Sequence, residues 1–223
     1  MQKSRDAISG GALRMIVLKA DPPLKFPSQE DYAEAANKWA RSLEAAVRRG
    51  LSGELSESEF VSLFYARVYD TNLESWVLGR ARGGDLTGGP TYNDQVQARR
   101  LADFQSEFID RFSSDLVRGR YSEEKEGPEA GLRRARAYAM QARGGANEAF
   151  VAAQEPSEAI AWIRNAKESC KDCIDLASKT WTASTLYEFP GEGHTECRFN
   201  CQCELQIIRT GIACFSREDL TPP

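Results

Sequence analysis

Residues 170–203 hold five of the six cysteines of this 223-residue chain, in the segments Cys170-Lys171-Asp172-Cys173 and Cys197-Arg198-Phe199-Asn200-Cys201-Gln202-Cys203. Their spacing is C-x2-C-x23-C-x3-C-x-C. Two residues between paired cysteines allow a tight turn to direct both sulfurs at one metal ion, and a tetrahedral zinc site takes four such soft ligands. The stretch therefore predicts a zinc-organised knuckle with ligands drawn from Cys170, Cys173, Cys197, Cys201 and Cys203.

Five thiols exceed the four positions of a tetrahedral site, so one cysteine is spare. In an extended strand Cys201 and Cys203 would point to opposite faces, and the sequence does not choose between them. A zinc ion enclosed by protein ligands has a structural role, because catalytic zinc keeps one position open for water. The pattern predicts structural zinc and no zinc catalysis.

Other interpretations of the same cysteines stay open at this point. Two disulfides would suit an oxidising compartment, and inert buried thiols would need no metal. The first apolar run, 13–18, is short and is followed by Lys19 and Asp21, so we expect no signal peptide, which disfavours disulfides. A redox role for Cys170 and Cys173 is disfavoured because the pair does not follow a strand of a βαβ unit.

His194 is the only histidine of the chain and lies three residues before Cys197. It is an alternative zinc ligand, although the thiols already suffice. With a single imidazole, the chain has no further histidine to act as the base of a Cys-His or Ser-His-Asp site. We therefore expect no enzymatic activity. Cys214 stands apart and is interpreted as a small buried apolar residue.

The chain ahead of the cysteines has the apolar periodicity of helices. From Tyr32 to Val47, apolar side chains recur at intervals of three and four residues. Ser56 and Glu59 form a capping-box pattern at the start of the next periodic segment. On these and similar signals we expect helices at 32–50, 56–77, 101–116, 128–143 and 156–166, the last leading directly into the first cysteine pair.

Glycines separate these segments. Five of them fall between Gly79 and Pro90 and predict a long loop, and Gly144-Gly145 is expected to end the fourth helix. Near the C-terminus the apolar residues Leu205, Ile207 and Ile208 predict a short strand.

The sequence thus predicts a mainly α protein: a helical N-terminal body with a small, irregular, zinc-knuckle-like C-terminal region that carries a short β element. We divide it into an irregular N-terminal arm at 1–28, a helical body at 29–160 and a cysteine-rich zinc-binding region at 161–223.

Charge and hydropathy narrow the function classes. The chain has 33 acidic and 29 basic side chains, a net charge of −4, which argues against a basic footprint for nucleic acid over the whole molecule. No stretch approaches the roughly 18 apolar residues of a membrane span. Arginines do concentrate in the middle of the chain, so a zinc-dependent nucleic-acid-binding or regulatory module is an alternative function. They are Arg99, Arg100, Arg118, Arg120, Arg133, Arg134, Arg136 and Arg143.

The cysteine segment and its flanks resemble a known family. The residues that carry the likeness are Trp162, Cys170 to Ala177, Trp181, Pro190-Gly191-Glu192-Gly193, Thr195, Cys197 and Asn200-Cys201-Gln202-Cys203-Glu204-Leu205. The stretch resembles the C-terminal motif of phage minor head proteins, of the phage Mu type of head morphogenesis protein. Many members carry a histidine-proline-asparagine run before the last cysteines, whereas Cys197 and its Pro-Gly-x-Gly turn stand there in this chain.

This resemblance implies a non-enzymatic virion or assembly component that acts near the portal during procapsid assembly or genome packaging. The implied partners are portal, capsid or scaffold proteins, with packaged DNA as a further contact that the arginines permit. The implied location is the virion and the host cytoplasm, with no membrane partner.

Overall fold

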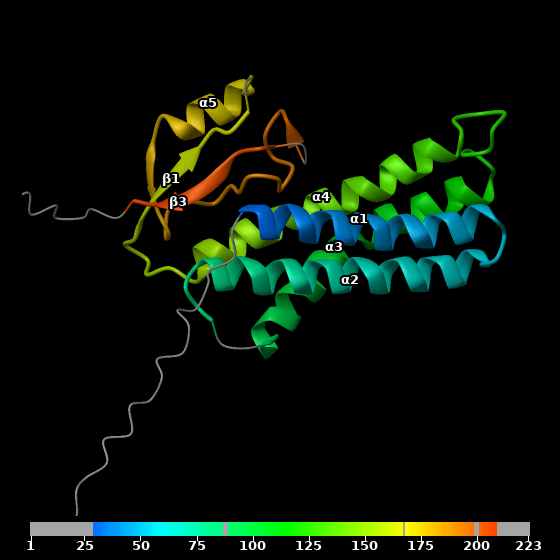
Figure 1. The fold of residues 1–223 in the computed structure, drawn as a ribbon, viewed down its shortest axis with the longest axis horizontal. Coiled ribbons are helices and arrows are strands. Elements are labelled where there is room, and N and C mark those ends of the chain that lie inside the picture. The colour runs from blue at the N-terminus through cyan, green and yellow to red at the C-terminus, as the bar shows by residue number, and fades with distance from the viewer. Residues whose placement is uncertain (1–28, 87–88, 167, 199–200, 209–223) are drawn as a thin grey trace, which may run out of the picture.

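The computed structural model describes residues 29–86, 89–166, 168–198 and 201–208. Four long helices lie side by side, and a small sheet with a short helix covers one end of them (Figure 1). The helices are α1 (Gln29–Leu51), α2 (Glu57–Arg82), α3 (Tyr92–Val117), α4 (Pro128–Ala152) and α5 (Lys171–Ala177). The strands are β1 (Ala159–Ile163), β2 (Thr180–Thr182) and β3 (Glu204–Ile207). The mainly helical fold with a C-terminal cysteine region and short strands is therefore confirmed.

Local sequence signals set the starts of the long helices. The capping box of α2 forms as expected, with the Ser56 hydroxyl accepting from the Glu59 amide and the Glu59 carboxylate accepting from the Ser56 amide. Thr91 and Asp94 form a second capping box that begins α3. Pro128 stands at the first turn of α4, where its missing N–H has no helical partner to lose.

An aromatic core joins the four helices. The Phe64 ring lies edge-on to Phe112 at 5.4 Å and to Tyr138 at 5.1 Å between centroids, so α2, α3 and α4 meet at one point. Leu43 and Val47 of α1 are fully buried in the same cluster. Edge-to-face ring pairs add about 0.5–1.5 kcal/mol each beyond the area they bury.

One buried ion pair fixes the connection from α2 to α3. Asp94 is completely buried, and its carboxylate accepts from the Arg80 guanidinium at 3.0–3.2 Å while it also caps α3. The Arg80 Nη2, which donates to Asp94, also donates to the Gly89 carbonyl oxygen at 3.1 Å. The side chains of the helix ends therefore hold the glycine-rich loop, which is shorter than expected because α2 runs on to Arg82 and α3 begins at Tyr92.

Two sequence expectations about the helices are wrong. The segment expected as a helix at 156–166 is the central strand β1, in which Ile160 and Trp162 are buried while their neighbours are less so. β1 pairs with a strand on each side, and these pairings outweigh the helical spacing of its apolar residues. In addition, α4 does not end at Gly144-Gly145 but continues to Ala152, because other chain segments pack closely against both glycines.

The sheet is antiparallel with the order β2-β1-β3. Trp162 pairs with Leu205 of β3, which confirms the expected C-terminal strand. A second hydrophobic cluster forms under this sheet, and Phe150 and Val151 from the last turns of α4 belong to it. One helix thus supplies apolar side chains to both clusters.

The expected arm at 1–28 and Cys214 lie outside the described residues. Among the helices that the structure describes, none is long and apolar enough to cross a membrane.

Helices α2 and α4 approach most closely at Gly79, where a Cβ atom would collide with the Ala146 carbonyl oxygen. We expect Gly79→Ala to lower the free energy of unfolding by about 3 kcal/mol, because the two backbones would have to separate. Urea denaturation followed by circular dichroism measures this change. Gly119→Ala is the control: its Cβ meets no atom within 4 Å, and only the positive φ of 67° is strained, at about 1 kcal/mol. Equal losses in the two variants would contradict the close-contact explanation.

Candidate metal centre

Three separate chain segments bring the cysteines together. Cys170 is the N-cap of α5 and Cys173 lies in its first turn, so the C-x2-C pair begins a short helix. Cys197 follows the Pro190–Gly193 turn, and Cys201 and Cys203 lead into β3. The described residues therefore place all five predicted ligands in one region, at the end of the helical bundle.

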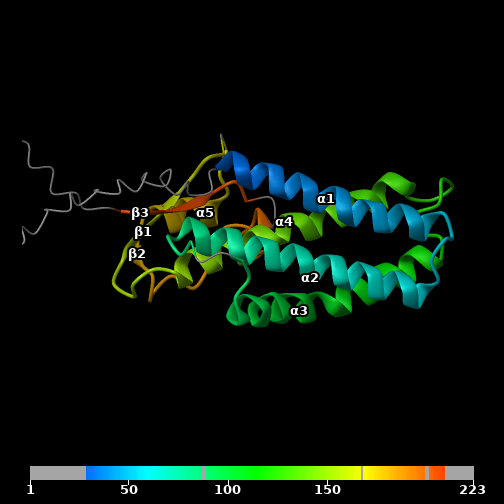
Figure 2. The same cartoon turned by 60° about the horizontal axis from the view of Figure 1, so that its bottom comes forward.

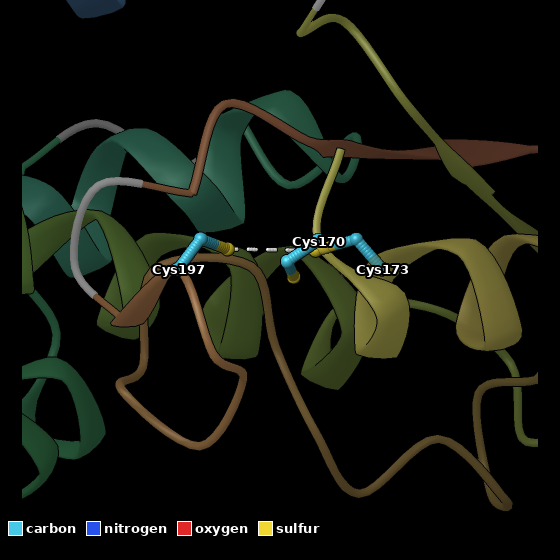
Figure 3. Close-up of side chains that lie close together, drawn as sticks. All are labelled: Cys170, Cys173 and Cys197. Carbon is cyan, nitrogen blue, oxygen red and sulfur yellow. Dashed lines mark hydrogen bonds between the residues drawn. The ribbon is translucent and has the colours of Figure 1, made fainter. Parts of the chain in front are cut away.

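Cys173 is the centre of this cluster. Its Sγ lies 3.5 Å from the Sγ of Cys197, as Figure 3 shows, and 3.6 Å from the Sγ of Cys201. Around a tetrahedral zinc ion with bonds of about 2.3 Å, sulfurs lie roughly 3.8 Å apart. The sulfurs form two groups within 4.8 Å that share Cys173, one with Cys170 and Cys197 and the other with Cys201 and Cys203. The cluster can bind a metal ion.

The five cysteines are free thiols. A disulfide requires sulfurs at about 2.05 Å, far closer than the separations around Cys173. The separations are those of free thiols rather than of disulfides.

The cluster is closed to solvent on its inner side. Cys173, Cys201 and Cys203 are at most 2% exposed, while Cys170 and Cys197 are half-buried. The burial of Cys173, Cys201 and Cys203 limits the access of water to the inner side of the cluster.

Hydrogen bonds between thiols prepare some of them as thiolates. The Cys201 thiol donates to the Cys203 sulfur, and this bond lowers the pKa of Cys203 to about 6. The same bond raises the pKa of Cys201, and burial raises it further. The structure thus favours a thiolate at Cys203, the protonation state that ligates metal.

In the first cysteine pair, too, one thiol has a lowered pKa and the other a raised pKa. Burial alone would raise the pKa of Cys170, but backbone N–H groups of Cys173 and Cys197 donate to its sulfur and lower the pKa overall. Burial raises the pKa of Cys173, and its hydrogen bonds to the sulfurs of Cys170 and Cys197 raise it further. The Thr195 hydroxyl lies 3.2 Å from the Cys197 sulfur.

Two carboxylates fasten the outer side of the cluster. The Asp172 carboxylate accepts from the Glu196 amide at 2.8 Å, and the Glu196 carboxylate accepts from the Lys171 amide at 3.2 Å. These reciprocal bonds join the first pair of cysteines to the turn that carries Cys197. Asp172 and Glu196 also lie near the Cys170 sulfur, but their oxygens are harder ligands than the thiolates and already hold backbone amides.

Trp162 is a neighbour of the site whose role the sequence alone does not reveal. It is 2% exposed, and its Nε1 is the one buried side-chain nitrogen or oxygen of the described residues without a hydrogen-bond partner of ordinary geometry. An indole N–H can only donate a hydrogen bond. The Trp162 N–H faces the Cys203 thiol closely enough to lower the pKa of that thiol. A thiolate at Cys203 would satisfy this donor.

Arg143 of α4 attaches the cysteine region to the bundle. Its guanidinium donates to three successive carbonyl oxygens, at 3.0 Å to Cys201, 3.4 Å to Gln202 and 3.1 Å to Cys203. Its positive charge also contributes to lowering the pKa of Cys203. The arginine that the sequence suggested for phosphate contact is used here to hold the segment of the last two cysteines.

The Pro190–Gly193 turn packs the cysteine region against α4 through a second set of contacts. The Asn147 amide donates to the Pro190 carbonyl oxygen at 2.7 Å, and both residues are buried. A Cβ on Gly144 would lie 2.7 Å from the Glu192 Cα, so only glycine permits this approach. The glycine expected to end the helix therefore serves as a contact surface.

The remaining candidates stay outside the cluster. His194 is exposed and belongs to none of the metal-ligating groups formed by the described residues. Of the eight predicted basic arginines, five are paired with carboxylates: Arg99, Arg100, Arg120, Arg134 and Arg136. These ion pairs neutralise most of the local charge that suggested nucleic-acid contact.

No protein-family model, curated protein or solved structure matches this chain. The likeness to phage head proteins therefore stands on the residues of the cysteine segment alone.

We expect Arg143→Lys to loosen the cysteine region without unfolding the bundle, because an ammonium group cannot reach three carbonyl oxygens as the planar guanidinium does. Amide exchange in β3 should become about tenfold to a hundredfold faster, since hydrogen bonds from a charged donor are worth about 1.5–3 kcal/mol. Hydrogen exchange read by mass spectrometry measures it. Arg133→Lys, on the exposed side of the same helix, should leave the exchange unchanged. Equal protection in both variants would contradict the role given to Arg143.

Proposed function

We propose that this chain is a phage head morphogenesis component, a minor head protein, whose C-terminal region is held together by a structural zinc ion. The observation that carries the proposal is the convergence of the family-like segment. All five of its cysteines meet with Trp162 in one cluster at the end of a helical bundle, and the Pro190–Gly193 turn is hydrogen-bonded to α4 of that bundle.

Zinc is the metal we assign to the cluster. Thiolates are soft ligands, and an all-sulfur set favours zinc over magnesium, calcium or manganese. The ligands would come from Cys170, Cys173, Cys197, Cys201 and Cys203. Bound there, the ion supplies a rigid crosslink between three chain segments.

The crosslink is important because the cysteine region is small. Apparent zinc-binding free energies in small structural modules are about 10–16 kcal/mol, as large as the folding free energy of a whole domain. The second hydrophobic cluster is smaller than that of the bundle, so the metal would contribute most of the stability of this region.

We expect purified protein to contain one zinc per chain, and Cys173→Ser to abolish zinc binding because Cys173 belongs to both sulfur groups. The C-terminal region should then become sensitive to protease while the helical circular dichroism of the bundle persists. Elemental analysis with free-thiol counting gives the metal content. Cys214→Ser is the matched control and should retain the zinc. Full zinc content in Cys173→Ser, or none in the unaltered protein, would remove the zinc assignment.

The proposed role in the phage head can be tested in purified procapsids and virions. We expect the gene to lie beside portal and terminase genes, and the protein to be present in few copies in procapsids and virions from the phage that encodes it. Quantitative mass spectrometry of purified particles gives the copy number, and crosslinking identifies the neighbour, expected to be portal, capsid or scaffold protein. A nonsense mutation in the gene should leave defective heads. The proposal would be refuted if purified particles lacked the protein and if its gene lay among metabolic genes.

The acidic partners of the central arginines lead us to propose no separate nucleic-acid-binding function. Contact with packaged DNA stays a prediction of the resemblance, and its test is the salt dependence of DNA binding by the purified protein.

A further inference from the structure

A cavity of about 470 Å³ lies where the cysteine region meets the bundle, away from the sulfurs. Its walls come from the first turns of α1, the end of α2, the middle of α4 and the segment that enters β3. The two views of the fold show the start of α1 beside that segment (Figures 1 and 2). This volume is within the range of about 300–1,000 Å³ of ligand sites in proteins.

Two guanidinium groups line the cavity, and neither forms an ion pair among the residues that the structure describes. Arg143 donates to the three carbonyl oxygens of the cysteine segment, and Arg82 donates to the Leu205 carbonyl oxygen. A guanidinium has five N–H donors, so both groups keep donors beyond those bonds. Arginines elsewhere in the bundle, such as Arg100 and Arg136, are paired with carboxylates.

The charges of the lining are unbalanced toward positive. Arg82 is held in place over the Phe150 ring, 4.8 Å from its centroid. Burial lowers the pKa of Arg82, and the nearby charge of Arg143 lowers it further, although the carboxylate of Glu204 acts in the opposite direction. Glu204 is also engaged by the Gln206 amide, which donates to it at 2.6 Å. Two half-buried guanidinium groups, opposed by a single carboxylate, give the lining a net positive charge that suits an anion.

Part of the cavity lining is apolar. Ala36 of α1 and Ala139 of α4 contribute methyl groups, and Met140 adds a flexible thioether side chain. Small side chains at these positions keep the space open, and a methionine adapts to ligands of different shape. A ligand with a charged head and an apolar body would match this mixed lining.

We propose that this cavity binds a small organic anion, with its carboxylate or phosphate held by Arg82 and Arg143 and its apolar part against α1 and α4. Bidentate hydrogen bonding by guanidinium groups is the common mode of recognition for both kinds of oxyanion. The site uses no metal-ligand side chain, although it shares Arg143 with the contact that holds the cysteine segment, and its test does not depend on the function proposed above.

The test is calorimetric titration of the full-length protein with three probes of equal chain length: hexanoate, hexyl phosphate and hexanol. We expect one of the two anions, or both, to bind at one site per chain, and hexanol not to bind. Tighter binding of hexanoate would identify a carboxylate ligand, and tighter binding of hexyl phosphate a phosphate ligand.

Two variants and a control locate the site. Arg82→Gln should weaken anion binding about tenfold to a hundredfold, because it removes a charged hydrogen-bond donor. Ala36→Leu should weaken anion binding by filling part of the cavity without changing its charge. This second variant keeps the test valid if Arg82→Gln destabilises the fold. Arg111→Gln removes an exposed arginine of α3 and should leave binding unchanged. No binding of either anion, equal binding of hexanol, or unchanged binding in Ala36→Leu would overturn the proposal.

Discussion

The close approach of α4 to the backbone of the Pro190–Gly193 turn is the constraint on which the arrangement of this molecule depends. Gly144 has no side chain to separate the helix from Glu192, and Asn147 donates to the Pro190 carbonyl oxygen one helical turn further on. The helix passes through this contact without interruption. Its first half therefore packs in the bundle and its last turns pack under the sheet.

The cysteine cluster depends on the same helix through Arg143. The guanidinium holds the three carbonyl groups around Cys201 and Cys203, so the last two thiols are positioned from outside their own segment. The Cys201 thiol of the same segment and the Trp162 indole of β1 favour negative charge on Cys203. Tertiary contacts thus favour a negatively charged sulfur, the form that binds a cation, without help from a bound metal ion.

Much of this architecture follows from the sequence because its signals are local. The capping box at Ser56 and the apolar stripe of α1 depend on residues three and four apart, and the C-x2-C spacing depends on a single turn. The predictions fail where contacts with segments distant in the sequence determine the local structure. Spacing around Trp162 fits a helix, yet pairing with Thr180–Thr182 and Glu204–Ile207 makes it a strand. The same holds for Arg143, whose partners lie some 60 residues away.

Chain order has a consequence for how the protein is made. Every buried side chain of the bundle cluster lies between Trp39 and Ala142, and the first cysteine follows only at Cys170. During synthesis the N-terminal part of a chain emerges first and domains generally fold as units. The bundle can therefore be complete on the ribosome, with Arg143 and Asn147 already in place, before the last cysteines emerge. The folded bundle then offers fixed hydrogen-bond donors to the Pro190 turn and to the Cys201–Cys203 segment as each emerges.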